Sequence, residues 1–369
     1  MKQQSSGSLL PTLLGASALF ILAGLLHTNR ASAQEADWQA YNREAYATDI
    51  LPAYARFAER TRGLVEATRA LCNTTDSAHL EQARDAFRQS LNAWQGVSHL
   101  QFGPATYLMR NFSIEFWPDR KSIGRKQLQA VLAMPADTAF DDEFFHHASV
   151  SIKGLPALEQ LLFEADALTR LNGQGVHCRL TQAIAANLAV MADGIHRDWQ
   201  HEGETRLSDT DTGSDEEDTS AIPAFSIDLM KSLVEPIEAI RDTKLLAPMG
   251  KGPDITYPHR AESWRSEQSL ANIRANLHAA YALFKGEKAG VEQLLQQQDA
   301  GDLAEKIDRQ FRQLDDQLEP LGDSLTQALK SNYTELAAVT DSLKALDQLL
   351  GQAMQSLNVQ LGFNSRDGD

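Results

Sequence analysis

The sequence has few cysteines, a deficit of basic residues and none of the common hydrolase motifs. Only 2 cysteines occur in 369 residues, and 34 lysines and arginines stand against 50 aspartates and glutamates, for a formal net charge of −16. It contains no His-Glu-x-x-His zinc motif, no Gly-x-Ser-x-Gly nucleophile motif and no glycine-rich phosphate loop. So acidic a chain repels nucleic acid and anionic lipid headgroups, which excludes partners of both kinds.

Long apolar runs are also absent, except near the N-terminus. Lys2 precedes an apolar stretch from Leu13 to Leu26, and Ala31-Ser32-Ala33 has the small-residue pattern of a cleavage site. The stretch is short for a membrane-spanning helix and is interrupted by glycine. We expect residues 1–33 to be a signal peptide that is cleaved after Ala33, rather than a retained anchor. The mature chain then works in the periplasm and does not span the membrane.

Export to an oxidising compartment would favour a bond between the two cysteines, Cys72 and Cys178. In an oxidising compartment an isolated pair is more often bonded than free. Two distant cysteines are too few for a structural zinc site, which needs four ligands. We therefore predict a structural Cys72–Cys178 disulfide.

Helical periodicity dominates the rest of the chain. Apolar residues recur at steps of three and four, for example at Leu80, Ala83, Phe87, Leu91 and Trp94. Alternating strand patterns and Asn-Gly or Asp-Gly hairpins are lacking. The predicted fold class is all-α, with long helices packed as bundles.

An acidic stretch divides the helical pattern in two. Residues 201–220, HEGETRLSDTDTGSDEEDTS, have no apolar face. A calcium loop would need Gly where Ser214 stands and Glu where Ser220 stands, so a solvated linker is the better interpretation. We predict an N-terminal bundle over 34–200, an acidic linker or loop over 201–220 and a C-terminal bundle over 221–369.

Three segments carry candidate functional residues. In GLPALEQLLF, Glu159 lies about one turn into a helix that Pro156 can begin, as a capping carboxylate or as a buried functional acid. The stretch from Phe102 to Gly124 is predicted to be non-helical, and its mixture of charged and aromatic residues suits either a cleft wall or a surface loop. Farther along, His259 and Glu262 are three residues apart, so on a helix they would share one face. They could act there as metal ligands or form a surface pair.

Five blocks in the same order resemble the imelysin-like family of bacterial periplasmic proteins, over nearly the whole mature chain. They are AWQGVSHLQFGP, FSIEFWPDR, KGLPALEQLLF, ESWRSEQSLANIRANL and the ending LGFNSRDGD. The resemblance implies two helical bundles packed side by side, with a ligand site in the cleft between them. It also implies a peptidase label and a link to iron regulation and uptake.

The family's hallmark is a Gly-x-His-x-x-Glu motif, which reads Gly154 to Glu159 in this sequence. Pro156 stands in place of the histidine and offers no metal-binding atom. With that exception, polar residues of the separate blocks are expected to converge on the cleft. The predicted ligand-binding residues are Arg110, Glu115, Trp117, Asp119, Glu159, Trp264, Arg265, Ser266, Asn364 and Asp367. The predicted metal ligands are Glu159, His259 and Glu262, for iron or another divalent metal.

Three functions follow from these features. The first is a periplasmic binding or accessory protein linked to the acquisition of iron or another metal. The second is a binding module for an organic ligand or an envelope protein partner, without metal. The third, a peptidase, has the least support because no activated water or nucleophile is visible.

Overall fold

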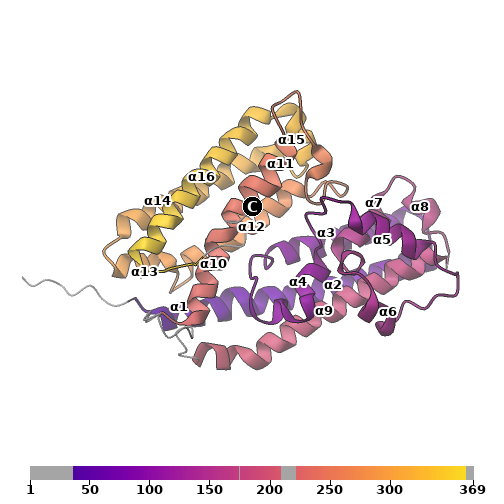
Figure 1. Ribbon diagram of the computed structural model, residues 1–369, viewed down its shortest axis with the longest axis horizontal. Coiled ribbons are helices and arrows are strands. Elements are labelled where there is room, and N and C mark those ends of the chain that lie inside the picture. Colours follow the sequence, from indigo (N-terminus) through magenta and orange to yellow (C-terminus); the bar gives the residue numbers. More distant parts are fainter. Residues whose placement is uncertain (1–35, 174, 209–221, 363–369) are drawn as a thin grey trace, which may run out of the picture.

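The computed structural model describes residues 36–173, 175–208 and 222–362, and every regular element within these ranges is a helix (Figure 1). An isolated bridge pairs Gly252 with Ile255. The predicted all-α class is confirmed. The expected signal peptide, residues 1–33, lies outside the described residues.

The helices form two bundles that lie side by side (Figure 1). The first bundle comprises α1 (Trp38–Glu44), the π-helix η1 (Ala45–Ile50), α2 (Leu51–Asn73), α3 (Ser77–Gln95), η2 (Gly103–Ala105), η3 (Tyr107–Met109), α4 (Arg110–Ile114), α5 (Ile123–Leu132), α6 (Asp142–His147), η4 (Val150–Ile152), α7 (Leu155–Phe163), α8 (Ala167–Arg170) and α9 (Val176–Ser208). The second comprises α10 (Ala224–Ala239), the π-helix η5 (Ile240–Leu246), α11 (Ala247–Met249), η6 (Pro258–Arg260), α12 (Ser269–Lys285), α13 (Val291–Gln297), α14 (Gly301–Leu318), η7 (Glu319–Leu321), α15 (Leu325–Ser331) and α16 (Tyr333–Ser356).

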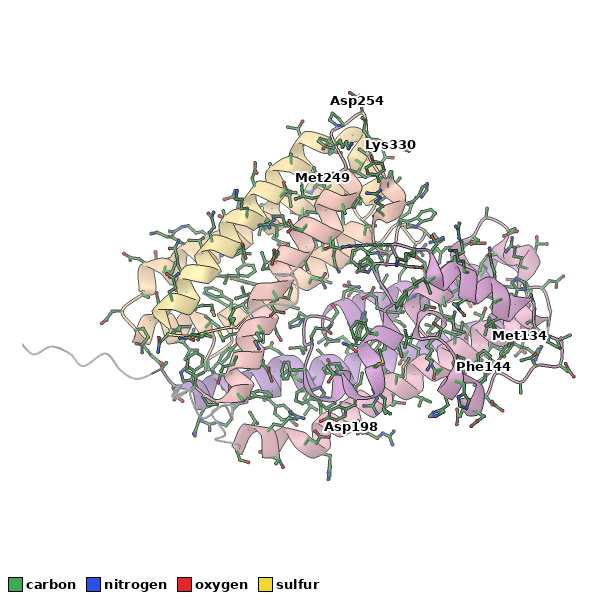
Figure 2. The ribbon with its side chains drawn as sticks, in the orientation of Figure 1. Met134, Phe144, Asp198, Met249, Asp254 and Lys330 are labelled. Atoms are coloured by element: carbon green, nitrogen blue, oxygen red, sulfur yellow. A yellow bond between two sulfur atoms is a disulfide. The ribbon has the colours of Figure 1, made fainter. Side chains whose placement is uncertain are left out.

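Apolar stripes hold each bundle together. The stripe predicted from Leu80 to Trp94 lies on α3 and is buried, and α2 packs against both α3 and α9. In the second bundle α16 packs against α10 and α14. Tyr333, the first residue of α16, donates a hydrogen bond to the Met249 carbonyl oxygen of α11. Met249 is labelled in Figure 2. No helix of the described residues is both long and apolar enough to cross a membrane.

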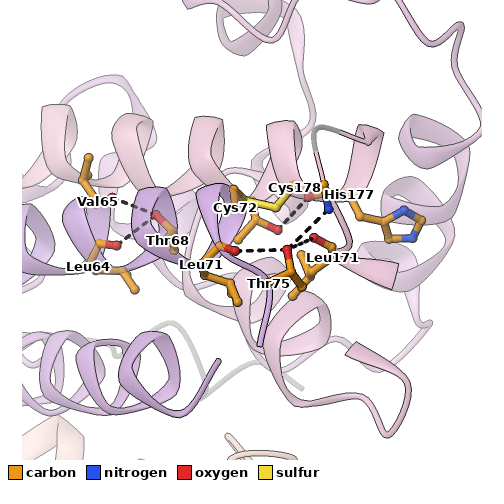
Figure 3. The surroundings of a disulfide bond; sticks show 11 residues. Leu64, Val65, Thr68, Leu71, Cys72, Thr75, Leu171, His177 and Cys178 are labelled. Atoms are coloured by element: carbon orange, nitrogen blue, oxygen red, sulfur yellow. Dashed lines mark hydrogen bonds between the residues drawn. A yellow bond between two sulfur atoms is a disulfide. The ribbon is translucent and has the colours of Figure 1, made fainter. Parts of the chain in front are cut away.

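A disulfide joins the end of α2 to the start of α9. Cys72 and Cys178 are bonded, with their Cα atoms 5.6 Å apart (Figure 3). Beside them, the Thr75 hydroxyl is 3.2 Å from the carbonyl oxygens of both Leu71 and Leu171. The predicted pairing is therefore present, and it fixes the two longest helices of the first bundle to each other at one end.

Two local predictions were wrong. Helix α9 continues to Ser208, so residues 201–208 are helical instead of linker. Glu202 and Arg206 form an ion pair one turn apart, and Tyr107 donates to the same Glu202 carboxylate, which offsets the acidity of these turns. Residues 209–220 lie outside the described residues. The stretch from Phe102 to Gly124 also contains helical turns, among them α4.

Candidate functional site

A cavity of about 980 Å³ lies where the two bundles meet. The first bundle supplies the segment that precedes α5 and the start of α7, and the second supplies η5, η6 and the turn after η6. The lining residues that carry polar or aromatic groups include Glu115, Phe116, Trp117, Asp119, Arg120, Ser122, Arg125, Ser151, Glu159, Gln160, Asp242, Thr243, His259, Arg260, Glu262, Ser263, Trp264 and Arg265. Eight of the predicted ligand-binding or metal residues line this cavity: Glu115, Trp117, Asp119, Glu159, His259, Glu262, Trp264 and Arg265.

The start of α7 is fixed by a close backbone approach. Gly154 is the N-cap of α7, and a side chain there would meet the Ile114 carbonyl oxygen at 2.2 Å and that of Ser113 at 2.3 Å. Only glycine lets the end of α4 pass so near. Pro156 then occupies the first turn, where its missing N–H costs nothing. The GLP sequence therefore places α7 against the first bundle with Glu159 directed toward the second.

Glu159 is a buried acid that joins the bundles and caps no helix. Its Oε1 accepts hydrogen bonds from the Ser266 hydroxyl at 2.7 Å and from the Ser266 backbone N–H at 2.9 Å. Burial raises the pKa of the Glu159 carboxyl, and the two hydrogen bonds from Ser266 oppose that rise in part. Of the two interpretations of Glu159, the structure supports the buried acid.

Glu115 is a second carboxyl at the junction. Trp94 Nε1 donates to its Oε2 at 2.7 Å, and Gln95 Nε2 donates to its Oε1 at 2.9 Å. Burial is the largest cause that raises the pKa of Glu115 to about 8, and nearby Glu262 adds to it, while Lys244 acts in the opposite direction. Burial and the neighbouring Glu262 thus favour the uncharged, protonated form of this carboxyl.

Lys244 connects the two bundles through all three of its ammonium protons. It donates to Gln95 Oε1 at 3.0 Å, to Glu262 Oε2 at 2.8 Å and to Asn276 Oδ1 at 2.7 Å. The side chains of Lys244 and Glu262 are 12% and 4% exposed, so this is a buried ion pair, and Glu262 Oε2 also accepts from Asn272 Nδ2 at 2.8 Å. Lys244 lies on the π-helix η5, an element that is frequent at functional sites.

Aromatic rings form part of the cavity wall. The Lys244 ammonium lies 5.9 Å from the centre of the Trp117 ring. Trp264 contacts His259, with ring centres 4.2 Å apart, and the Arg265 guanidinium lies 4.3 Å from the Trp264 ring centre. These rings offer flat apolar surface beside fixed positive charge.

Four arginines, Arg120, Arg125, Arg260 and Arg265, line the same cavity. Their side chains make no hydrogen bond or ion pair with any other residue that the structure describes, although Arg260 stacks on Tyr257 and Arg265 on Trp264. Two acids of the cavity, Asp119 and Asp242, do have hydrogen-bond or ion-pair partners. Asp119 accepts from the Ile123 and Gly124 backbone N–H groups at the start of α5, and Asp242 pairs with Arg241 outside the cavity.

Arg110 does not reach the cavity, contrary to prediction. Its guanidinium lies against Gly194 of α9, where the missing side chain leaves room for it, and pairs with Asp198. Figure 2 labels Asp198 on α9, along the lower edge of the first bundle. Arg110 therefore fastens α4 to α9. Asn364 and Asp367 lie outside the described residues.

The predicted metal set is not assembled. Across the described ranges, no group of three or more His, Cys, Asp or Glu side chains is placed to hold a metal ion. Glu159 binds Ser266, Glu262 binds Lys244 and Asn272, and His259 packs on Trp264. A resident iron or other divalent ion does not fit these donors as they are arranged, because the two carboxylates already have protein partners.

Four residues that form hydrogen bonds at the junction of the bundles were not predicted from the sequence: Gln95, Lys244, Asn272 and Asn276. A signal for the two asparagines was present: they lie four residues apart, beside the apolar stripe of Leu270, Ile273 and Leu277. Polar residues so close to a buried stripe need partners inside the protein. Lys244 gave no such signal, because its three partners come from three separate segments.

The comparisons with known proteins agree with this architecture. The family model for imelysin, which carries a peptidase name, matches residues 50–353. Iron-regulated protein A of Synechococcus elongatus is 26% identical over 313 residues, which is 80% of this chain and 82% of the relative. The crystal structure of an imelysin-like protein from Psychrobacter arcticum superposes with a TM-score of 0.71 at 18% identity, and covers 89% of this chain and 99% of its own.

Proposed function

The chain belongs to the imelysin family, and from that premise we propose that it is an exported, iron-linked accessory protein that binds a small organic anion in the cavity between its bundles. The similarity to iron-regulated protein A supports an iron-linked accessory role. The expected signal peptide supports export to the periplasm. The anion is proposed from the cavity itself.

Four arginines without a side-chain hydrogen bond or ion pair among the described residues carry the proposal. Arg120, Arg125, Arg260 and Arg265 face a cavity in which burial raises the pKa of Glu115 and Lys244 pairs with Glu262. An acidic protein of net charge −16 thus presents local positive charge at this site. Guanidinium groups match carboxylate oxygens in geometry as well as in charge. A ligand with one or more carboxylates would supply hydrogen-bond acceptors for guanidinium groups that have none among the described residues.

The aromatic wall specifies the rest of the ligand. Trp117, Trp264 and Phe116 supply apolar surface, and 980 Å³ is in the range of small-molecule pockets. A flat organic body with an anionic group fits both features. Since the described residues assemble no metal site, iron would enter such a site only together with a ligand that supplies its own donors.

A charge-matched series of aromatic compounds tests this function. Benzoate, benzyl alcohol and benzylamine have similar size and differ in charge, and 2,3-dihydroxybenzoate adds oxygen atoms that can chelate iron. We expect the two carboxylates to raise the melting temperature progressively as their concentration increases, and the alcohol and the amine to have no such effect. Stabilisation by benzylamine alone would reverse the charge assignment and overturn the proposal.

A further inference from the structure

A second hollow of about 790 Å³ lies between the bundles and shares no lining residue with the cavity. It is a groove between α2 and α3 of the first bundle and α12 of the second. Small residues make it hollow: Ala271, Ala275, Ala279 and Ala282 come from α12, and Ala93 faces them from α3. Small residues alone do not define a binding site, so the charged and polar groups around them decide what the groove can hold.

Arginines from both bundles surround this groove. Arg56 and Arg60 come from successive turns of α2, Arg88 from α3 and Arg274 from α12, whereas the carboxylates among the described lining residues are those of Asp49 and Asp323. Like charges four residues apart on a helix repel each other. Such an excess of positive charge in a chain of net charge −16 is stabilised when an anion lies between the arginines.

Two of these arginines, Arg56 and Arg60, have no charged partner among the described residues and keep donors free for a ligand. Arg56 makes no side-chain hydrogen bond or ion pair with the residues described, and Arg60 binds only the neutral Gln89 amide at 3.0 Å. Arg88 pairs with Asp85 on its own helix. Arg274 binds Asp323 and the Leu318 and Gly322 carbonyl oxygens, which hold its guanidinium in place.

His99 is an independent polar feature of the same groove. It lines the groove, is 8% exposed, and its Nδ1 has no hydrogen-bond partner in the described chain. Burial lowers the pKa of His99 to about 4, so that the ring is neutral at physiological pH. A buried ring nitrogen without a partner is uncommon, and it leaves an unsatisfied polar group in the wall of the groove.

We propose that this groove binds a compact polyanion, with two or more carboxylate or phosphate groups, that bridges Arg56 and Arg60 of the first bundle to Arg274 of the second. Among the residues that the structure describes, no Phe, Tyr or Trp side chain lines the groove, so the ligand differs in class from the flat organic anion proposed for the cavity. A ligand with two or more anionic groups can contact arginines of both bundles at once. Binding would hold the two bundles together across α2 and α12.

Isothermal titration of the full mature chain with citrate, and separately with pyrophosphate, tests the groove. Two double variants remove the same charge: Arg56→Gln/Arg60→Gln in the groove, and Arg69→Gln/Arg309→Gln at exposed ion pairs outside both hollows. Arg265→Gln reports on the cavity. We expect the groove variant to weaken binding of the preferred probe at least about tenfold, and the other two variants to bind within about twofold of the wild type.

Three results would overturn the proposal. They are no saturable binding of either probe at about 10 mM, an equal loss in the Arg69→Gln/Arg309→Gln control, and a loss in Arg265→Gln without one in the groove variant. The last result would place the polyanion in the cavity, so failure of the groove and failure of the proposed function are distinguishable. Preference for citrate or for pyrophosphate identifies the anionic group as carboxylate or phosphate.

Discussion

Glu159 on α7 accepts two hydrogen bonds from Ser266, one from its backbone N–H and one from its hydroxyl, across the boundary between the two bundles. Both residues are buried. Glu159 could have capped its own helix, but it accepts hydrogen bonds from the second bundle instead. The same boundary carries Lys244 and Glu115, so stability and ligand binding are expected to depend on one another at this place.

Glu159→Ala should destabilise the protein by about 1 to 3 kcal/mol, because the buried Ser266 N–H loses its acceptor and the Ser266 hydroxyl keeps only the Ser263 carbonyl oxygen. Urea unfolding measures the loss. Glu66→Ala on the exposed face of α2 is the control, where we expect less than about 1 kcal/mol, since surface pairs contribute little. Equal effects of the two substitutions would show that the Glu159–Ser266 contact has no special importance.

Lys244→Met should cost more, about 3 to 5 kcal/mol, because it leaves Glu262 buried without its counter-charge. The double variant Lys244→Met/Glu262→Gln removes that charge as well, and should recover part of the loss. A double-mutant cycle by urea unfolding checks this. If the two single losses simply add, Lys244 and Glu262 are not coupled.

The raised pKa of Glu115 makes stability fall as pH rises. Its pKa is about 8 in the folded protein, against an ordinary value of 4.5. Between these values the folded state holds a proton that the unfolded chain releases, so each pH unit in this window reduces the free energy of unfolding by up to about 1.4 kcal/mol. Glu115→Gln, which resembles the protonated acid, should gain on the wild type from pH 5 to pH 8. Asp49 and Glu159 also have raised pKa values, but they are present in both proteins and cancel. A constant difference across this range would contradict the assignment.

Loss of the Cys72–Cys178 bond should destabilise the protein by about 4 to 5 kcal/mol, because the bond closes a loop with a sequence separation of 106. The Cys72→Ser/Cys178→Ser variant, and the wild type treated with reductant, should melt at a similar lowered temperature by calorimetry. The reductant should not shift the double variant. An unchanged melting temperature on reduction would mean that the bond adds nothing to stability.

The sequence predicted features that depend on local pattern or on chemistry. The α3 stripe from Leu80 to Trp94 follows from periodicity, and the Cys72–Cys178 pairing from export. The structure also brings Glu115, Trp117 and Trp264 to one cavity, as the family resemblance implied. The resemblance identified the sequence blocks that meet at the cavity. It did not show which polar residues in these blocks form hydrogen bonds or ion pairs with other residues of the protein.

The predictions that were wrong depended on contacts between distant segments. Arg110 was assigned to the cleft, but Gly194 and Asp198 on α9 give it a site that no local pattern shows. Glu262 was expected to ligate a metal, and a lysine eighteen residues earlier binds it instead. In each case the charged residue forms an ion pair with a residue that is distant in sequence, and only the tertiary fold brings the two together.

The affinity for 2,3-dihydroxybenzoate, measured by isothermal titration on the wild type, Arg265→Gln, Arg265→Lys and the control Arg309→Gln, tests the central proposal most directly. We expect one site per chain, a loss of at least about tenfold in Arg265→Gln, a smaller loss in Arg265→Lys, which keeps the charge without the fork geometry, and no change in Arg309→Gln. Wild-type binding weaker than about 1 mM, or equal affinity for the wild type and Arg265→Gln, would contradict an anion-binding cavity.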